Sequence, residues 1–129
     1  MAFVNIKVRK MLKTDTLKKN YHFKNILKKG KYYKGKCIDI YLKKNNKEKN
    51  YIGIAVGVKL AKAVKRNRVK RLIRENYRLL ERNMKTGYSI VFICRKNQNI
   101  EKINFYNVKE DMVNILKSAE ILWKNFLLS

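Results

Sequence analysis

Proline is absent from this sequence of 129 residues, and no stretch is rich in glycine or serine. Segments of that composition commonly form the linkers between domains. The sequence also contains no internal repeat of the kind that builds repeat proteins. The chain is therefore predicted to be one domain over residues 1–129, with a flexible, basic N-terminal arm over about residues 1–19.

Cysteine and histidine are scarce, with two copies and one copy respectively. Cys37 and Cys94 form no Cys-x-x-Cys pair and have no histidine partner, which argues against a zinc site. Both lie in apolar segments with the pattern of strands, and this favours buried free thiols in a reducing cytosol. We therefore expect a cytoplasmic protein that binds no metal or other cofactor by itself.

Long apolar runs are also missing. No segment approaches the roughly 20 apolar residues that span a bilayer, and residues 1–15 lack the apolar segment of a signal peptide. Apolar residues nevertheless make up 46% of the chain, which is enough for a hydrophobic core. We expect a folded protein without a membrane partner.

Acidic residues number nine, against 33 lysines and arginines, and the formal net charge is +24. A small domain with this charge repels itself, and binding to a polyanion relieves the repulsion. Nucleic acid is the first candidate partner. Because the carboxylates are scattered and His22 has no acid–base partner, neither a metal-dependent nor a histidine-based nuclease site is expected. We assign no catalytic residue to the chain.

Hydrophobic periodicity predicts an α+β fold. Strands are expected over about residues 37–42, 52–58 and 88–95, and helices over about residues 21–29, over 62–83 and after a cap at Asn104. The order α-β-β-α-β-α is typical of a two-layer sandwich with a small mixed sheet. In the second strand, Gly53, Ala55 and Gly57 share a face with little side-chain bulk. Either a packed helix or a bound ligand could lie against that face.

The helix predicted over 62–83 separates an apolar face from a basic face when it is wound at about 3.6 residues per turn. The basic face carries Asn67, Arg71, Arg74, Arg78 and Arg82, flanked by Arg68 and Lys70, whereas Arg66 falls nearer the apolar side. No acidic residue lies between Val56 and Arg74, so the intrahelical ion pairs of an ordinary charged helix are not expected. The cations are predicted to be unpaired, except that Glu75 and Glu81, which come later, can pair with a few of them.

Such a row of arginines is suited to RNA, because the planar guanidinium group binds phosphate oxygens in pairs. Each phosphate contact would add to a salt-sensitive affinity. Abundant lysine alone could reflect A·T-rich codons. Arginine is not favoured by such codons, and six of the eight arginines lie between Arg66 and Arg82. A merely solvated basic face is the alternative.

The stretch from Gly53 to Glu75 resembles the bacterial ribonuclease P protein component. That family joins a glycine-containing strand to a helix carrying Arg-Asn-Arg, Lys-Arg and Arg-Glu, which read here as Arg66-Asn67-Arg68, Lys70-Arg71 and Arg74-Glu75. Leu17–Asn20 followed by Phe23 resembles the family's opening helix. The resemblance extends over about Leu17–Ala119. It implies a left-handed strand–helix–strand crossover through the long helix, where the general rule is right-handed.

The resemblance implies a non-catalytic protein subunit of ribonuclease P, which removes the 5′ leader of precursor tRNA. The chemistry is expected on the RNA subunit with Mg²⁺, the partners are that RNA and precursor tRNA, and no obligate protein partner is expected. The residues implied to bind the RNA subunit are Lys59, Lys62, Arg66, Asn67, Arg68, Lys70, Arg71, Arg74 and Arg78. The residues implied to form a cleft for the leader are Phe23, Leu27, Tyr41, Arg95 and Lys96.

The residues support this cleft in part. An aromatic side chain such as Tyr41, beside a floor of small residues and a basic rim, suits unpaired nucleotides, because bases stack on the ring while cations hold the backbone. For Phe23, an ordinary place in the core is the alternative. For the whole chain, the main alternative is a ribosomal protein or general RNA chaperone. A DNA-binding protein and a basic helix at a membrane surface are further alternatives.

Overall fold

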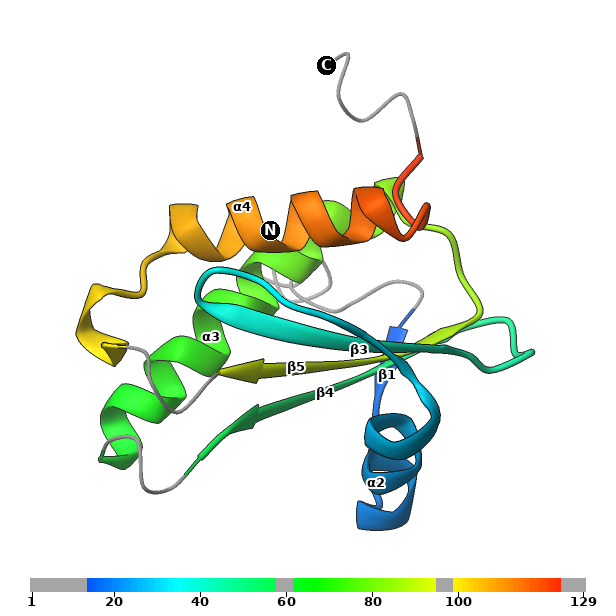
Figure 1. Cartoon of the computed structure of the whole chain (residues 1–129), viewed down its shortest axis with the longest axis horizontal. Coiled ribbons are helices and arrows are strands. Elements are labelled where there is room, and N and C mark those ends of the chain that lie inside the picture. The colour runs from blue at the N-terminus through cyan, green and yellow to red at the C-terminus, as the bar shows by residue number, and fades with distance from the viewer. Residues whose placement is uncertain (1–13, 58–61, 95–98, 124–129) are drawn as a thin grey trace, which may run out of the picture.

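The structure is a computed structural model that describes residues 14–57, 62–94 and 99–123. Within these residues, five strands form one mixed sheet, and three α-helices pack on it (Figure 1). In sheet order the strands are β1 (Thr14–Thr16), β4 (Asn50–Val56), β5 (Tyr88–Cys94), β3 (Ile38–Lys44) and β2 (Lys31–Tyr33). The helices are α2 (Asn20–Lys29), α3 (Ala63–Leu80) and α4 (Phe105–Ser118). The predicted α+β class is confirmed.

The sheet combines both pairing directions. Strand β3 is antiparallel to β2 and β5, whereas β4 is parallel to β1 and β5. Because β4 and β5 are parallel neighbours, the chain between them must cross over, and it does so through α3. The strand–helix–strand unit implied by the resemblance is therefore present. Its left-handed sense stays a prediction.

The main core lies between one face of the sheet and helices α3 and α4. Alternate residues of the central strands face it, as the period of two predicts, and Ile40 pairs in register with Phe92. Tyr77 of α3 is fully buried, and its ring meets Phe92 edge to face with centroids 6.1 Å apart. Helix α4 adds Val108, Met112, Ile115 and Leu116. Together these side chains fix α3 and leave its opposite side in solvent.

Helix α2 lies on the other face of the sheet (Figure 1). Ile26 of α2 and Val91 of β5 are buried there, separately from the main core cluster. The expected two layers therefore describe only the main core, because α2 adds a third, partial layer. With ten residues, α2 covers part of this face.

Two short strands were not expected from the sequence. Residues 14–19, placed in the flexible arm by the sequence, are ordered in their first part as β1, which extends the sheet beyond β4 with Thr14 opposite Asn50. The Thr14 hydroxyl lies 2.6 Å from the buried Tyr77 hydroxyl, and Leu17 N–H donates to Ile52 O. Neither β1 nor β2 shows apolar alternation over its three residues, so periodicity could not reveal them. Residues 1–13 lie outside the described residues.

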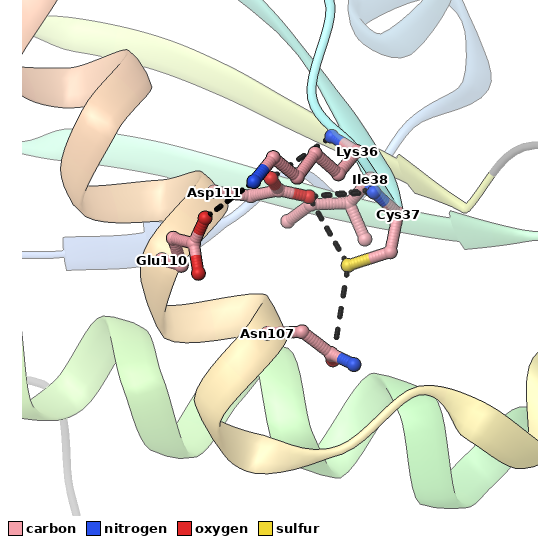
Figure 2. A network of polar contacts seen from close by, with 6 residues as sticks. All are labelled: Lys36, Cys37, Ile38, Asn107, Glu110 and Asp111. Carbon is pink, nitrogen blue, oxygen red and sulfur yellow. Dashed lines mark hydrogen bonds and ion pairs between the residues drawn. The ribbon is translucent and has the colours of Figure 1, made fainter.

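Helix α4 is held at its start and at its middle. Asn104 caps it as predicted, in a reciprocal pair with Asn107. In its second turn, the buried Asp111 carboxylate accepts hydrogen bonds from the backbone N–H groups of Lys36, Cys37 and Ile38, at 2.9, 2.7 and 3.0 Å (Figure 2). The Cys37 thiol donates to the same carboxylate at 3.1 Å. These bonds join α4 to the beginning of β3.

The cysteines are both buried and free, as predicted. The predicted long helix ends earlier than expected, at Leu80, and tightens into a short 3₁₀ helix over Glu81–Asn83. Near the C-terminus, Leu122 forms an isolated β-bridge with Met84, and Trp123 is half exposed. Residues 124–129 lie outside the described residues. Across the described ranges, the helices lack the length and apolar character needed to cross a membrane.

Candidate nucleic-acid interface

The outer face of α3 carries the arginine row. Asn67, Arg71 and Arg74 are exposed, and Lys70 is half-buried beside them. Within the described part of the chain, neither Arg71 nor Arg74 takes part in an ion pair. Spaced three residues apart, they lie on the same side of the helix about one turn from each other. The predicted row of free guanidinium groups is thus present at these two positions.

Three of the cations have partners among the described residues. The pair with Glu75 is one of the few that the sequence allowed, whereas the partners of Lys65 and Arg68 contradict the prediction. Arg78 Nη1 lies 2.8 Å from Glu75 Oε1, one helical turn away. Lys65 forms an ion pair with Glu101, which lies outside α3 in the segment before α4. The hydrogen bond from Lys65 holds the pKa of Glu101 below its usual value. The third residue, Arg68, binds the backbone.

The Arg68 guanidinium joins α3 to the segment before α4. Its Nη2 donates to Ile100 O at 2.8 Å and its Nη1 donates to Ile103 O at 2.9 Å. Ile100 is the first residue of the short 3₁₀ helix Ile100–Lys102, and Ile103 directly follows that helix. Arg68 therefore has a structural role that the sequence could not reveal, since Ile100 is 32 residues away.

The other residues implied to bind the RNA subunit are distributed around the beginning of α3. Lys62, at the N-cap, is exposed, and Arg66 is half-buried, in line with its predicted place nearer the apolar side. Lys59 lies outside the described residues, as do Arg95 and Lys96 of the implied leader cleft. The structure thus gives positions for eight of the nine residues in the first group and three of the five in the second.

On the opposite face of the sheet, Phe23 packs against the glycine of β4. A Cβ atom placed on Gly53 would lie 2.3 Å from Cε2 of the Phe23 ring and 3.1 Å from a methyl carbon of Leu17. Such distances exclude any side chain larger than hydrogen unless the ring moves. Of the two alternatives left open for this small-residue face, helix packing is the one that applies at Gly53. Phe23 remains half-buried.

Tyr41 lies farther along the same face, next to Tyr32 of β2. The two rings are tilted, with centroids 5.0 Å apart, and the Tyr32 hydroxyl donates to the buried Asp39 at 2.8 Å. Tyr32 is 46% exposed, and Tyr41 is half-buried. Tyr32 was not predicted from the sequence, although its place in a Lys-Tyr-Tyr segment after Gly30 could have indicated an aromatic binding residue. Two adjacent rings offer a surface on which bases can stack.

The leader-binding residues predicted on α2 and β3 therefore share one face of the sheet. In register, Gly53 lies opposite Val91 and Val91 lies opposite Tyr41, so the buried Val91 separates the site of Phe23 from that of Tyr41. Leu27, four residues after Phe23 on α2, is half-buried. Within residues 14–57, 62–94 and 99–123, His, Cys, Asp and Glu side chains nowhere gather in threes as a metal site would require.

Comparisons with known proteins give a consistent result. The model of the ribonuclease P family matches residues 11–120. The ribonuclease P protein component of Clostridium botulinum (strain Langeland) is 40% identical over 111 residues, which cover 85% of this chain and 98% of that protein. The solved ribonuclease P protein of Thermotoga maritima is 32% identical, with a TM-score of 0.72 over 80% of this chain and 96% of that one.

A second solved structure, the ribonuclease P protein of Staphylococcus aureus, is 31% identical and has a TM-score of 0.70. The match covers 83% of this chain and 96% of that one. Family, sequence and structure thus agree over nearly the whole length of these relatives, with the arginine-bearing α3 inside the matched region. The chain belongs to the bacterial ribonuclease P protein component family.

Proposed function

We propose that this chain promotes 5′ maturation of tRNA by holding two RNAs on two surfaces. The first surface is the outer face of α3, which would bind the RNA subunit of ribonuclease P. The observation that carries this proposal is the exposure of Arg71 and Arg74 without ion pairs among the described residues. Guanidinium groups in this state can bind phosphate without first breaking an ion pair with a carboxylate.

The second surface is the uncovered part of the sheet face beside α2. Phe23, Leu27, Tyr41 and the neighbouring Tyr32 would contact bases of the single-stranded leader, and Arg95 and Lys96 would hold its phosphates. The half-exposed tyrosine pair supports this assignment, since base–aromatic stacking contributes about 1–3 kcal/mol per base and accepts any sequence. The two surfaces lie on opposite sides of the sheet (Figure 1).

The RNA subunit, with Mg²⁺, would supply the hydrolytic chemistry in this assembly. The chain's own residues bind and orient the two RNAs and neutralise the repulsion between their phosphates. A net charge of +24 on one small domain is suited to this screening role. We propose that the complex acts in the cytoplasm and needs no other protein.

Reconstitution tests the proposal. The full chain is mixed with a bacterial ribonuclease P RNA, and cleavage of precursor tRNA is measured at low Mg²⁺, where repulsion between the RNAs is least screened. We expect cleavage to be faster than with the RNA alone. A rate equal to that of RNA alone, with a folded protein confirmed by circular dichroism, would remove the proposal.

A further inference from the structure

A basic pocket lies along the flank of α2 that faces away from Phe23 and Leu27. Its cavity volume is about 520 Å³, within the range of small-ligand sites. It is lined by residues 15–19 before α2, by α2 itself, by residues 43–47 at the end of β3 and in the turn that follows, and by one residue each of β4 and β5. Its basic side chains are Lys18, Lys19, Lys43, Lys44 and Lys47, and its one acidic side chain is Asp15.

The pocket is separate from both surfaces proposed above. Helix α2 contributes His22 and Asn25, which are three residues apart and therefore share a side of the helix. Phe23, Leu27 and Tyr41 do not line the cavity, and α3 contributes nothing to it. A ligand bound here would contact the opposite flank of α2 from the proposed leader surface.

Hydrogen bonds connect the walls of the pocket to one another. Lys43 Nζ donates to Asn25 Oδ1 at 2.8 Å, which ties β3 to α2. The Asn45 side chain organises the turn, because its Oδ1 accepts from Lys47 N–H at 2.8 Å and its Nδ2 donates to Ser89 Oγ at 3.3 Å. Asn46 adopts a left-handed backbone conformation, with φ of 58°, that closes the turn. A preformed site avoids much of the ordering cost of binding.

The lining matches the parts of a nucleotide. Exposed lysine ammonium groups are suited to phosphate, while asparagine amides and the Ser89 hydroxyl offer hydrogen bonds to a base or sugar. The half-buried Tyr51 ring provides an aromatic wall, and Lys47 Nζ lies 5.1 Å from its centroid. Asp15, whose Oδ1 accepts from Thr16 N–H at 2.8 Å, is the one carboxylate in a lining that holds five lysines. Because lysines lie on both sides of the cavity, they favour a single-stranded nucleic acid, in which each nucleotide has a phosphate on either side.

We propose that this pocket binds one nucleotide of a single-stranded RNA, with its flanking phosphates held by lysines from the two rims. It is a third RNA-binding site on the protein. The inference rests on the proposed function only in requiring that the natural ligand be RNA. The same phosphate chemistry is offered by free nucleotides and by inorganic phosphate, so the test must separate these sources.

The test compares two variants of the full chain that lose equal charge. Lys18→Gln/Lys44→Gln removes one exposed lysine from each rim of the pocket, and Lys109→Gln/Lys117→Gln removes two exposed lysines from α4. Binding of a short single-stranded RNA is measured by fluorescence anisotropy at several salt concentrations, with backbone NMR shifts to locate the contact. We expect the pocket variant to bind at least about three-fold more weakly than the α4 variant and to show a shallower salt dependence.

Two results would overturn the proposal. One is equal weakening by the two variants, which would show an effect of net charge alone. The other is displacement of the RNA by adenosine monophosphate or inorganic phosphate at concentrations near the affinity of the RNA itself, which would identify a free anion as the ligand. Shifts at residues 15–25 and 43–51 that the wild-type chain shows and the pocket variant lacks would support it.

The reconstituted cleavage assay keeps this outcome apart from that of the proposed function. If the wild-type chain stimulates cleavage but the two variants bind RNA equally, the pocket proposal is rejected and the proposed function stands. Absence of wild-type stimulation removes the proposed function, and the binding comparison still decides the pocket.

Discussion

The ring of Phe23 lies on the backbone of Gly53, so closely that α2 can rest on β4 only because this position has no side chain. The contact fixes how far α2 approaches the sheet. It therefore also fixes how much of that sheet face remains open toward Tyr41 on one flank of the helix, and the width of the basic pocket on the other. One glycine thus sets the geometry of both proposed single-strand sites.

Changing Gly53 to Ala should destabilise the fold by about 1–3 kcal/mol, the usual cost of forcing extra volume into a packed contact. Urea unfolding followed by circular dichroism measures the change. The control is the same substitution in a Phe23→Ala background, where the ring that would be displaced is missing. There we expect most of the cost to vanish, and an undiminished cost would show that the Phe23 contact is not its cause.

Arg68 and Arg71 should behave differently, although both belong to the same motif. Arg68→Ala removes two charged hydrogen bonds to carbonyls and should lower the free energy of unfolding by about 1.5–3 kcal/mol. Arg71→Ala changes an exposed side chain and should stay within about 0.5 kcal/mol. Arg71→Ala should still weaken binding to the RNA subunit and flatten its salt dependence. Equal stability losses for the two variants would contradict this division.

Tyr41→Ala should weaken binding of precursor tRNA to the assembled enzyme by about 1–3 kcal/mol, because it removes a stacking surface for the leader. Binding of the protein to the RNA subunit should not change. Tyr106→Ala, on α4, removes a tyrosine that is 77% exposed on the other side of the sheet and serves as the control. The two-surface proposal fails if Tyr41→Ala and Arg71→Ala impair the same step.

Asp111→Asn should cost about 2–3 kcal/mol, since an amide puts N–H groups where the carboxylate accepts from backbone N–H donors (Figure 2). Glu110→Gln is a matched control on the same turn. Among the described residues Glu110 pairs only with Lys36, at the surface, where ion pairs contribute little to stability. Thermal or urea unfolding distinguishes the two. A cost for Asp111→Asn no larger than that of the control would show that the buried carboxylate does not anchor α4.

Alkaline pH should destabilise the protein through Tyr77. Burial raises the pKa of this phenol to about 12, whereas an unfolded chain releases the proton near pH 10. Between these values only the folded state keeps the proton, so stability falls as pH rises, by about 1.4 kcal/mol per pH unit. Unfolding of the wild type and of Tyr77→Phe is compared across this window. The Phe variant should lack this part of the slope, and parallel curves would contradict the assignment.

The sequence predicted the long elements well because their apolar side chains repeat with the period of the structure. Ile38, Ile40 and Leu42 alternate into the core, and Asn104 starts α4 with a cap that local chemistry determines. The short strands β1 and β2 escaped prediction for the opposite reason. Three residues with polar side chains have no detectable period, and β1 is defined by its partner β4, far away in the sequence.

The candidate sites also combine features that the sequence predicts with features that only the fold creates. Exposure of Arg71 and Arg74 follows from helical geometry alone, and the sequence predicted it. The partner of Arg68 could not be predicted, because the carbonyls of Ile100 and Ile103 approach it only when α4 packs beside α3. The basic pocket was also missed, since its lysines come from two separate segments, residues 18–19 and 43–47, that the fold brings together.

Within the described residues, both outermost strands of the sheet have three residues. A long open strand at the border of a sheet is a template on which another molecule can add its own strand, and very short border strands deny it that template. Strong like charge between copies adds a second barrier to self-association. A newly made subunit that has not yet met its RNA is thereby protected from growing into fibrous aggregates.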